Sequence, residues 1–319
     1  MVTLNDIRAA QALLHGIAIR TPLLEWTGVA TDRKLFLKLE NLQPIGAFKL
    51  RGAYNKVASL TDNERRRGVI SYSSGNHAQG VAYAARALGV KATIVMPSNA
   101  PKNKSDATAA LGAEIVTVGP GSEERRLRAE QLAAEHGYII VPPYNDEKII
   151  GGQGTVGLEI LEDMPDVEMV LAPVGGGGLI SGISAAIKLT NPAIKVIGVE
   201  PELAGDARAS LQAGHVVSFP AEQVSQTLAD GLRTQGVGKI NFAHIRAYVD
   251  DIVYVKEGEI REATRALSAN SKTVAEPSGA VSVAAFMFHC SELPRTRNNV
   301  AVISGGNIDP HLLAELRRT

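Results

Sequence analysis

Two patterns of apolar and polar residues alternate along most of the chain. Short runs rich in valine and isoleucine, such as residues 68–73 (GVISYS), are typical of buried strands. The alanine-rich segments between them, such as residues 77–89 (HAQGVAYAARALG), have apolar residues at helical spacing, and this one ends at a glycine. The same patterns predict further strands over residues 91–97, 114–119, 138–143, 167–174, 194–200 and 299–306, and helices over residues 100–113, 122–137 and 179–190.

This alternation predicts an α/β protein with mostly parallel, twisted sheets flanked by helices. Strands that are apolar throughout fit sheets that are covered on both faces. A chain of 319 residues is too long for one small core and suggests two domains or one large unit. Ligands bind at the carboxyl ends of strands in such sheets, so the turns at residues 73–80, 173–182, 199–206 and 303–307 are the candidate functional segments.

Composition adds mainly exclusions. The chain has 33 Lys plus Arg and 33 Asp plus Glu, so its charge predicts neither a nucleic-acid nor a membrane partner. The single cysteine, Cys290, cannot form an internal disulfide. The N-terminal segment has the pattern of a helix rather than of a signal peptide, and no apolar run is long enough to cross a bilayer. We therefore expect a cytoplasmic enzyme or binding protein.

Four consecutive glycines, Gly175, Gly176, Gly177 and Gly178, join the apolar strand at 167–174 to the next helix. Without side chains, their backbone N–H groups can converge on an anion, and the helix N-terminus adds its dipole. A tight turn alone would need only one or two glycines. The loop therefore predicts a phosphate site, although its spacing fits neither a dinucleotide-binding motif nor a P-loop.

The turn SSGNHAQG, residues 73–80, also follows a strand and precedes a helix. It presents Ser73, Ser74, Asn76, His77 and Gln79, which together can bind a small carboxylate. Ordinary N-capping needs only one such residue, so the turn favours a ligand site.

Two further turns carry weaker signals. Ser304 lies at the end of the strand over 299–306 and can cap a helix or contact a ligand. Glu276 precedes Pro277 and Ser278; it is a candidate cofactor contact, but a helix start capped by Ser278 explains the segment equally well.

Glu200 and Asp206 lie in one turn after a predicted strand. Two carboxylates with backbone carbonyls between them suit a hard cation such as Mg²⁺ or Ca²⁺. Solvated loop acids are the commoner explanation of this spacing.

Lys49 lies among apolar residues and glycines in the segment NLQPIGAFKLRGAYN. Desolvation disfavours an ammonium, and a neutral amine can form a Schiff base with an aldehyde. Together with the glycine loop, Lys49 suggests the cofactor pyridoxal 5'-phosphate. Without that loop, a surface lysine would be the better explanation.

These segments occur together in a known family. KLENLQPIGAFKLRGA, SSGNHAQGVA, GGQGT, VGGGGLISG, GVEPE, LADG, AEPSGAV and ISGGNID resemble the threonine/serine dehydratases and serine racemases, over essentially the whole chain. The resemblance implies pyridoxal-phosphate enzymes of the tryptophan-synthase-β-like fold (fold type II). It also implies a small mobile substrate domain at residues 68–145, inserted into a large cofactor-binding domain of residues 1–67 and 146–319.

Roles at the cofactor follow from the resemblance residue by residue. Lys49 matches the Schiff-base lysine that also moves the α-proton, and Phe48 matches the aromatic residue against the pyridine ring. The glycines at 175–178 match the phosphate loop. Asn76 matches the contact to the ring hydroxyl, and Ser304 the contact to the pyridine nitrogen.

The resemblance also implies a substrate site and a metal site. Ser73, Ser74, Asn76 and His77 match the loop that takes the substrate carboxylate, and Ser74 also matches the opposite-face proton donor proposed in racemases. The divalent-cation site near the phosphate matches Glu200, Asp206 and the backbone carbonyl of Ala204.

One departure stands out. The family usually has serine where this chain has Ala47, two residues before Lys49. The missing hydroxyl affects rate and substrate preference more than cofactor binding.

The favoured function is a dehydratase (ammonia-lyase) that converts a β-hydroxy amino acid to a 2-oxo acid and ammonia. Its substrate is threonine, serine or a relative such as 3-hydroxyaspartate or phenylserine. The alternatives are a serine racemase on the same scaffold, and a catalytically silent protein that binds pyridoxal phosphate or a nucleotide. A homodimer is expected.

Overall fold

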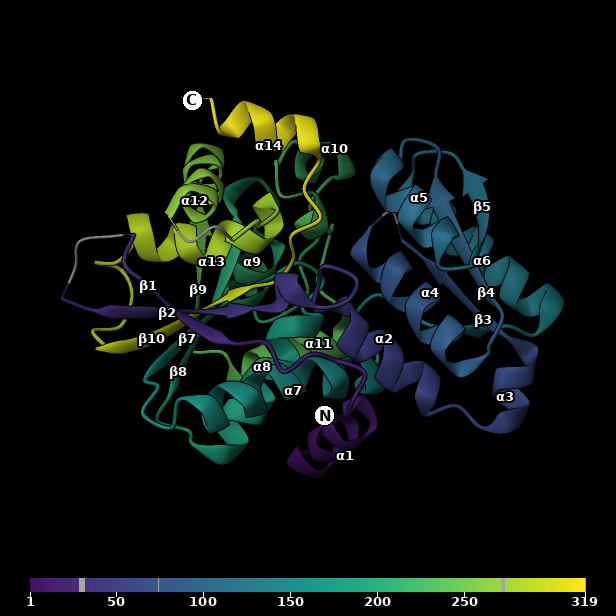
Figure 1. Cartoon of the computed structure of the whole chain (residues 1–319), viewed down its shortest axis with the longest axis horizontal. Coiled ribbons are helices and arrows are strands. Elements are labelled where there is room, and N and C mark those ends of the chain that lie inside the picture. Colours follow the sequence, from purple (N-terminus) through teal and green to yellow (C-terminus); the bar gives the residue numbers. More distant parts are fainter. Residues whose placement is uncertain (29–31, 74, 271–272, 319) are drawn as a thin grey trace.

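The strands of the protein form two separate sheets (Figure 1), in a computed structural model that describes residues 1–28, 32–73, 75–270 and 273–318. The larger sheet has the strand order β1-β2-β10-β7-β8-β9 and the smaller one β5-β4-β3-β6. The described strand pairs are parallel except β1 with β2, as the sequence predicts. The strands are β1 Leu23–Trp26, β2 Lys34–Leu39, β3 Val69–Tyr72, β4 Ala92–Pro97, β5 Glu114–Val118, β6 Ile139–Ile140, β7 Met169–Pro173, β8 Lys195–Pro201, β9 Asp251–Val255 and β10 Asn298–Ile303.

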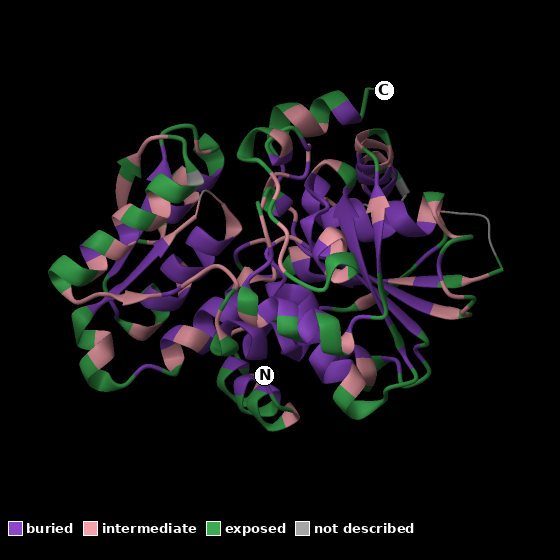
Figure 2. Ribbon diagram, turned by 180° about the vertical axis from the view of Figure 1, so that it is seen from behind, coloured by how far each residue is buried: buried purple, intermediate pink, exposed green. Residues whose placement is uncertain are grey.

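Helices cover both sheets, and Figure 2 shows the buried residues concentrated on the strands and on the helix faces turned toward them. Among the described residues, no helix combines the length and the apolar composition that crossing a bilayer requires. The helices are α1 Leu4–Leu14, α2 Lys49–Ala58, α3 Asp62–Arg67, α4 Asn76–Leu88, α5 Lys102–Ala110, α6 Ser122–His136, α7 Glu147–Asp163, α8 Gly178–Thr190, α9 Asp206–Ala213, α10 Ala221–Val224, α11 Lys239–Tyr248, α12 Glu257–Asn270, α13 Pro277–Phe288 and α14 Pro310–Leu316, with the 3₁₀ turns η1 Glu40–Leu42, η2 Glu202–Ala204 and η3 Asp230–Leu232.

The two sheets define two lobes that lie side by side (Figure 1). We call the unit of β3–β6 with α4, α5 and α6 the small lobe, and the unit built on the six-stranded sheet the large lobe. Helix α2 packs against α4 of the small lobe and against α7 of the large lobe. The first residue of α2 therefore lies where the lobes meet.

Glycines let helix backbones touch at this junction. A Cβ at Gly152 of α7 would lie 2.6 Å from the carbonyl oxygen of Arg51 on α2, and one at Gly182 of α8 would collide with the backbone nitrogen of Gly154. A Cβ at Gly80 of α4 would approach the Lys49 carbonyl oxygen to 3.0 Å. The segment GGQGT thus joins α7 tightly to both α2 and α8.

A buried ion cluster holds helix α2 in place. The guanidinium of Arg51 donates to both carboxylate oxygens of Glu40 and of Glu159, at 2.7–2.9 Å. Lys38 Nζ lies 2.7 Å from Glu159 Oε2. All four side chains are buried. Because each charge has an opposite partner, the cluster holds α2 against β2 and α7 at a tolerable desolvation cost.

Replacing Arg51 should destabilise the protein strongly. Arg51→Met leaves the Glu40 and Glu159 carboxylates with only Lys38 as a cation, so we expect the free energy of unfolding to fall by about 3–5 kcal/mol in urea denaturation. Arg66→Met, at an exposed position of α3, is the control and should remain near wild type. An Arg51→Met protein as stable as wild type would contradict this role of the cluster.

Candidate active site

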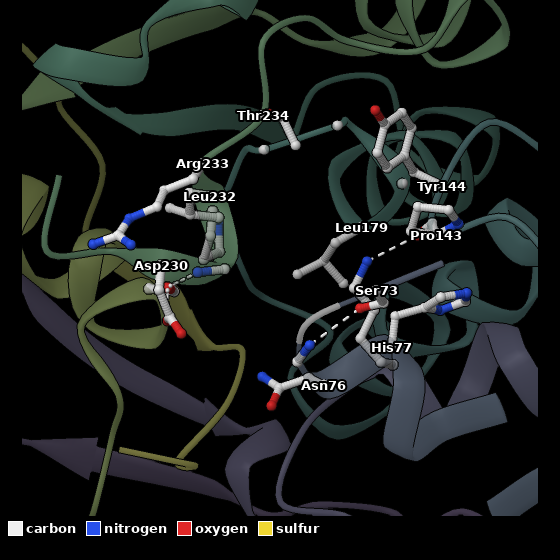
Figure 3. Close-up of a pocket in the computed structure, with 18 of the residues that line it drawn as sticks. Ser73, Asn76, His77, Pro143, Tyr144, Leu179, Asp230, Leu232, Arg233 and Thr234 are labelled. Atoms are coloured by element: carbon white, nitrogen blue, oxygen red, sulfur yellow. Dashed lines mark hydrogen bonds between the residues drawn. The ribbon is translucent and has the colours of Figure 1, made fainter. Parts of the chain in front are cut away.

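A cavity of about 320 Å³ lies between the lobes and contains most of the residues that the sequence singles out. Figure 3 shows Ser73, Asn76 and His77 on one side of it and Asp230, Leu232 and Arg233 on the other. The size suits a small ligand that is largely enclosed.

Lys49 is the first residue of α2 and lines this cavity. Its Nζ donates to the Pro143 carbonyl oxygen at 2.8 Å and lies 5.2 Å from the centre of the Phe48 ring. Burial lowers the pKa of Lys49 to about 8. A substantial fraction of the amine is therefore neutral near physiological pH, as nucleophilic attack requires.

The glycine loop links β7 to α8 and lines the same cavity. Gly177 has φ +90°, a left-handed conformation that favours glycine. A Cβ at Gly176 would overlap the ring of Tyr144, which covers the loop. Gly176 and Gly177 therefore have no room for a side chain, and the loop leads into the N-terminus of a helix of 13 residues, so the arrangement suits a phosphate group.

Asn76, at the start of α4, is held between two large-lobe residues. Its amide Nδ2 donates to Glu276 Oε1, and its Oδ1 accepts from Asn307 Nδ2 at 2.9 Å. Glu276 immediately precedes α13 and is buried. The orientation of the Asn76 amide in the cavity is thus fixed from both sides.

Ser73, Gly75 and His77 of the same turn also line the cavity, whereas Gln79 is buried away from it. Ser73 Oγ accepts from Gly75 N at 3.2 Å. His77 is buried; its Nε2 lies 3.0 Å from the Val141 carbonyl oxygen, and its Nδ1 has no described partner. Burial lowers the pKa of His77 to about 3, so the ring is neutral. Ser74, a predicted catalytic residue, lies outside the described residues.

Ser304 follows β10 and is buried at the cavity, where its Oγ donates to the Ser278 carbonyl oxygen at 3.4 Å. Its own carbonyl accepts from the Phe48 backbone N–H at 3.0 Å. Ser278 does not cap α13, because its hydroxyl instead accepts from Gly231 N at 2.8 Å. Glu276, rather than Ser278, occupies the N-cap position of α13, and its side chain lines the cavity.

Glu200, Ala204 and Asp206, the predicted metal ligands, are all fully buried. The Glu200 carboxylate accepts from the backbone N–H groups of Ala207 and Arg208 at 2.9 Å each, whereas neither carboxylate oxygen of Asp206 has a described hydrogen-bond partner. Burial raises the pKa of Asp206 to about 7 and that of Glu200 well above its usual range. Among the described residues, no group of three or more His, Cys, Asp or Glu side chains could hold a metal ion.

The structure adds residues that the sequence did not single out. Lys104 of α5 and Asp230 of η3 line the cavity and form an ion pair of 2.7 Å. Pro143 supplies the carbonyl that holds Lys49. In the sequence, Asp230 appears only as part of the motif LADG, and nothing marks Lys104 as a site residue beyond its place in a predicted helix.

The residues at the cavity fit pyridoxal 5'-phosphate. The glycine loop lines the cavity without side chains and leads into the N-terminus of α8, and Lys49 supplies an amine with a lowered pKa. The Asn76 amide gives one N–H to Glu276 and keeps a second that a ligand can accept. The predicted cofactor and the site therefore agree in chemistry.

Comparisons with known proteins identify close relatives. Residues 15–305 match the model of the family described as pyridoxal-phosphate dependent enzyme. The L-threonine ammonia-lyase of Thermotoga maritima is 47% identical over 98% of this chain and 77% of its own length.

Solved structures give the same result. The T.th. threonine deaminase superimposes with a TM-score of 0.91 at 42% identity, covering 97% of this chain and 99% of its own. Maize serine racemase superimposes with a TM-score of 0.94 at 36% identity, covering 98% and 96%. The fold, the site and these relatives lead to one conclusion: the chain belongs to the family of pyridoxal-phosphate-dependent enzymes and has their type II fold.

Proposed function

We propose that this protein is an ammonia-lyase that converts L-threonine, or a close β-hydroxy amino acid, to a 2-oxo acid and ammonia. The observation that carries the proposal is a lysine amine of lowered pKa that lines the same cavity as a glycine loop. It occurs in a chain 47% identical to an L-threonine ammonia-lyase.

Residues from both lobes would hold pyridoxal phosphate. The glycine loop and the N-terminus of α8 would bind its phosphate, and Phe48 would pack against its ring. Asn76 would meet the ring hydroxyl and Ser304 the ring nitrogen; Glu276 would support Asn76. When bound, the cofactor stabilises negative charge that develops at the substrate α-carbon.

Lys49 and the turn at 73–80 would act on the substrate. Ser73, Ser74, Asn76 and His77 would orient the substrate carboxylate, helped by the N-terminus of α4. The neutral amine of Lys49 would remove the α-proton, and the β-hydroxyl would take up a proton and leave as water. Hydrolysis of the enamine that remains would give the 2-oxo acid and ammonia. Ser304 is neutral and would not protonate the ring nitrogen, which favours elimination over transamination.

Racemisation on the same scaffold is less well supported. It would need a proton returned to the opposite face of the α-carbon, the role proposed for Ser74. The maize serine racemase is 36% identical to this chain, against 47% for the threonine ammonia-lyase.

We also propose features of the whole protein. Residues 68–145, which contain the entire four-stranded sheet, would form a mobile substrate domain. The unpartnered Asp206 carboxylate supports a divalent cation such as Mg²⁺ or Ca²⁺ with Glu200 and the Ala204 carbonyl. A cytoplasmic homodimer is the expected form.

Assays over a panel of β-hydroxy amino acids test the function. We expect 2-oxo acid and ammonia in equal amounts, fastest from L-threonine or L-serine, with chiral chromatography of the remaining substrate as the companion measurement. Accumulation of D-serine without matching pyruvate would instead establish a racemase.

Removing the amine of Lys49 should abolish turnover without unfolding the protein. We expect Lys49→Ala to lower kcat by roughly 10³-fold or more, and borohydride should no longer fix the cofactor to the chain. Lys56→Ala, at the other end of α2, is the matched control and should keep both properties. Wild-type activity in Lys49→Ala would refute the assigned role.

Cofactor uptake should follow the protonation of Lys49. Because the pKa of Lys49 is lowered to about 8, its reactive neutral form grows as pH rises and is nearly complete above that value. We expect the rate at which apoprotein takes up pyridoxal phosphate to rise roughly tenfold per pH unit below 8 and then to level off. A rate still rising at about pH 10 would indicate an ordinary lysine.

A further inference from the structure

A buried cation joins the two lobes across the cavity. Lys104, on α5 of the small lobe, has a side chain only 4% exposed. Its Nζ lies 2.7 Å from Asp230 Oδ2 and 3.1 Å from Glu276 Oε2, both of the large lobe. An ammonium removed from water is stable only when it is paired, so this position requires the lobes to be together.

The pairing keeps Lys104 charged. Burial favours its neutral form, but the carboxylates of Glu276 and Asp230 favour the ammonium more strongly and raise the pKa of Lys104. The lysine is therefore a cation throughout the physiological pH range, unlike Lys49 in the same cavity.

The two carboxylate oxygens of Glu276 accept hydrogen bonds from two different helices of the small lobe, α5 and α4. Oε2 accepts from Lys104, and Oε1 accepts from the amide of Asn76. An ionised carboxylate can only accept, which fixes Asn76 with its Nδ2 toward Glu276 and its Oδ1 toward Asn307. A protonated Glu276 could donate instead, and the amide would lose its single orientation.

The stem of Lys104 lies beside the turn at 73–80. A Cβ added at Gly75 would come within 3.4 Å of Lys104 Cδ, and both residues line the cavity. The same side chain thus lies next to the predicted substrate turn and is linked, through Glu276, to the predicted cofactor contact Asn76.

We propose that Lys104 is a positioning residue that closes the small lobe onto Glu276 and Asp230, and so aligns Asn76 and the substrate turn at the cofactor. The inference rests on the proposed function of the cavity. Lys104 does not touch the reacting atoms; it acts by keeping Glu276 an acceptor and α5 against the large lobe.

Lys104→Met tests this, because it removes the charge and keeps the length of the stem. We expect the dissociation constant for pyridoxal phosphate and the KM to rise by roughly tenfold to a hundredfold, with a smaller change in kcat. Hydrogen exchange in the first turn of α4 should also become faster in the apoprotein. Lys102→Met, on the same helix but 87% exposed, is the matched control and should change none of these.

The pH dependence separates positioning from general destabilisation. The described charged groups that face Glu276 are Lys104 of α5 and Asp230 of η3. Without Lys104, Glu276 should hold its proton to higher pH, so the cofactor affinity of Lys104→Met should recover as pH rises. Lys104→Arg should restore much of the affinity at neutral pH.

The outcomes are distinguishable. Wild-type protein that takes up no pyridoxal phosphate overturns the proposed function. Wild-type protein that takes it up, with Lys104→Met within twofold of it in affinity, KM and pH profile, overturns the role of Lys104. If Lys104→Met does not fold, Asp230→Asn is the second test, because it removes one of the two carboxylates paired with Lys104. This variant must also raise the dissociation constant for pyridoxal phosphate; an unchanged constant would overturn the proposal.

Discussion

Contact between helix backbones is the constraint on which the site depends. Helix α2 begins with Lys49 and α8 begins with the glycine loop, and both are drawn against α7 by glycines with no room for a Cβ. Helix α4, which begins with Asn76, also approaches α2 closely at Gly80, where a Cβ would come within 3.0 Å of the Lys49 carbonyl oxygen. Three helix N-termini thus converge on one cavity because small residues let their axes approach. A methyl group at any of these contacts would separate groups that must act within a few ångströms of each other.

Three basic side chains in the interior of the protein differ in their partners. Arg51 is enclosed by carboxylates and serves as a fixed anchor. Lys104 is paired across the gap between lobes, so its stability depends on their arrangement. Lys49 has no carboxylate partner among the described residues; its Nζ donates to the Pro143 carbonyl and lies near the Phe48 ring, and desolvation shifts it toward the neutral amine. Lysine therefore serves as a cation at Lys104, which has two carboxylate partners, and as a nucleophile at Lys49, which has none among the described residues.

Local patterns predicted most strands and the glycine loop, because buried parallel strands are apolar throughout and a phosphate cradle excludes side chains. The pattern missed three strands: β1 has only four residues, β2 carries two lysines in six residues, and β9 begins at the exposed Asp251. Residues 138–143 were predicted as a strand, but only Ile139 and Ile140 pair, since the chain then turns toward Lys49. Lys104 and Asp230 could not be paired from sequence, because only the folded arrangement of the lobes brings them together. Ala47 is fully buried and its backbone bridges to Gly305, so the absent serine hydroxyl leaves this part of the frame intact.

The position of β10 in the large sheet has a consequence for synthesis on the ribosome. This strand comes late in the chain but lies between β2 and β7, and the residues just after it bond to Ala47 and Phe48. Lys49 leaves the ribosome long before Ser304 and Glu276 exist. The nascent chain can fold its small lobe early, yet it cannot assemble the cavity until the last strand has inserted. The cofactor would then bind only after folding is complete and would not assist folding, and truncated chains would lack the site.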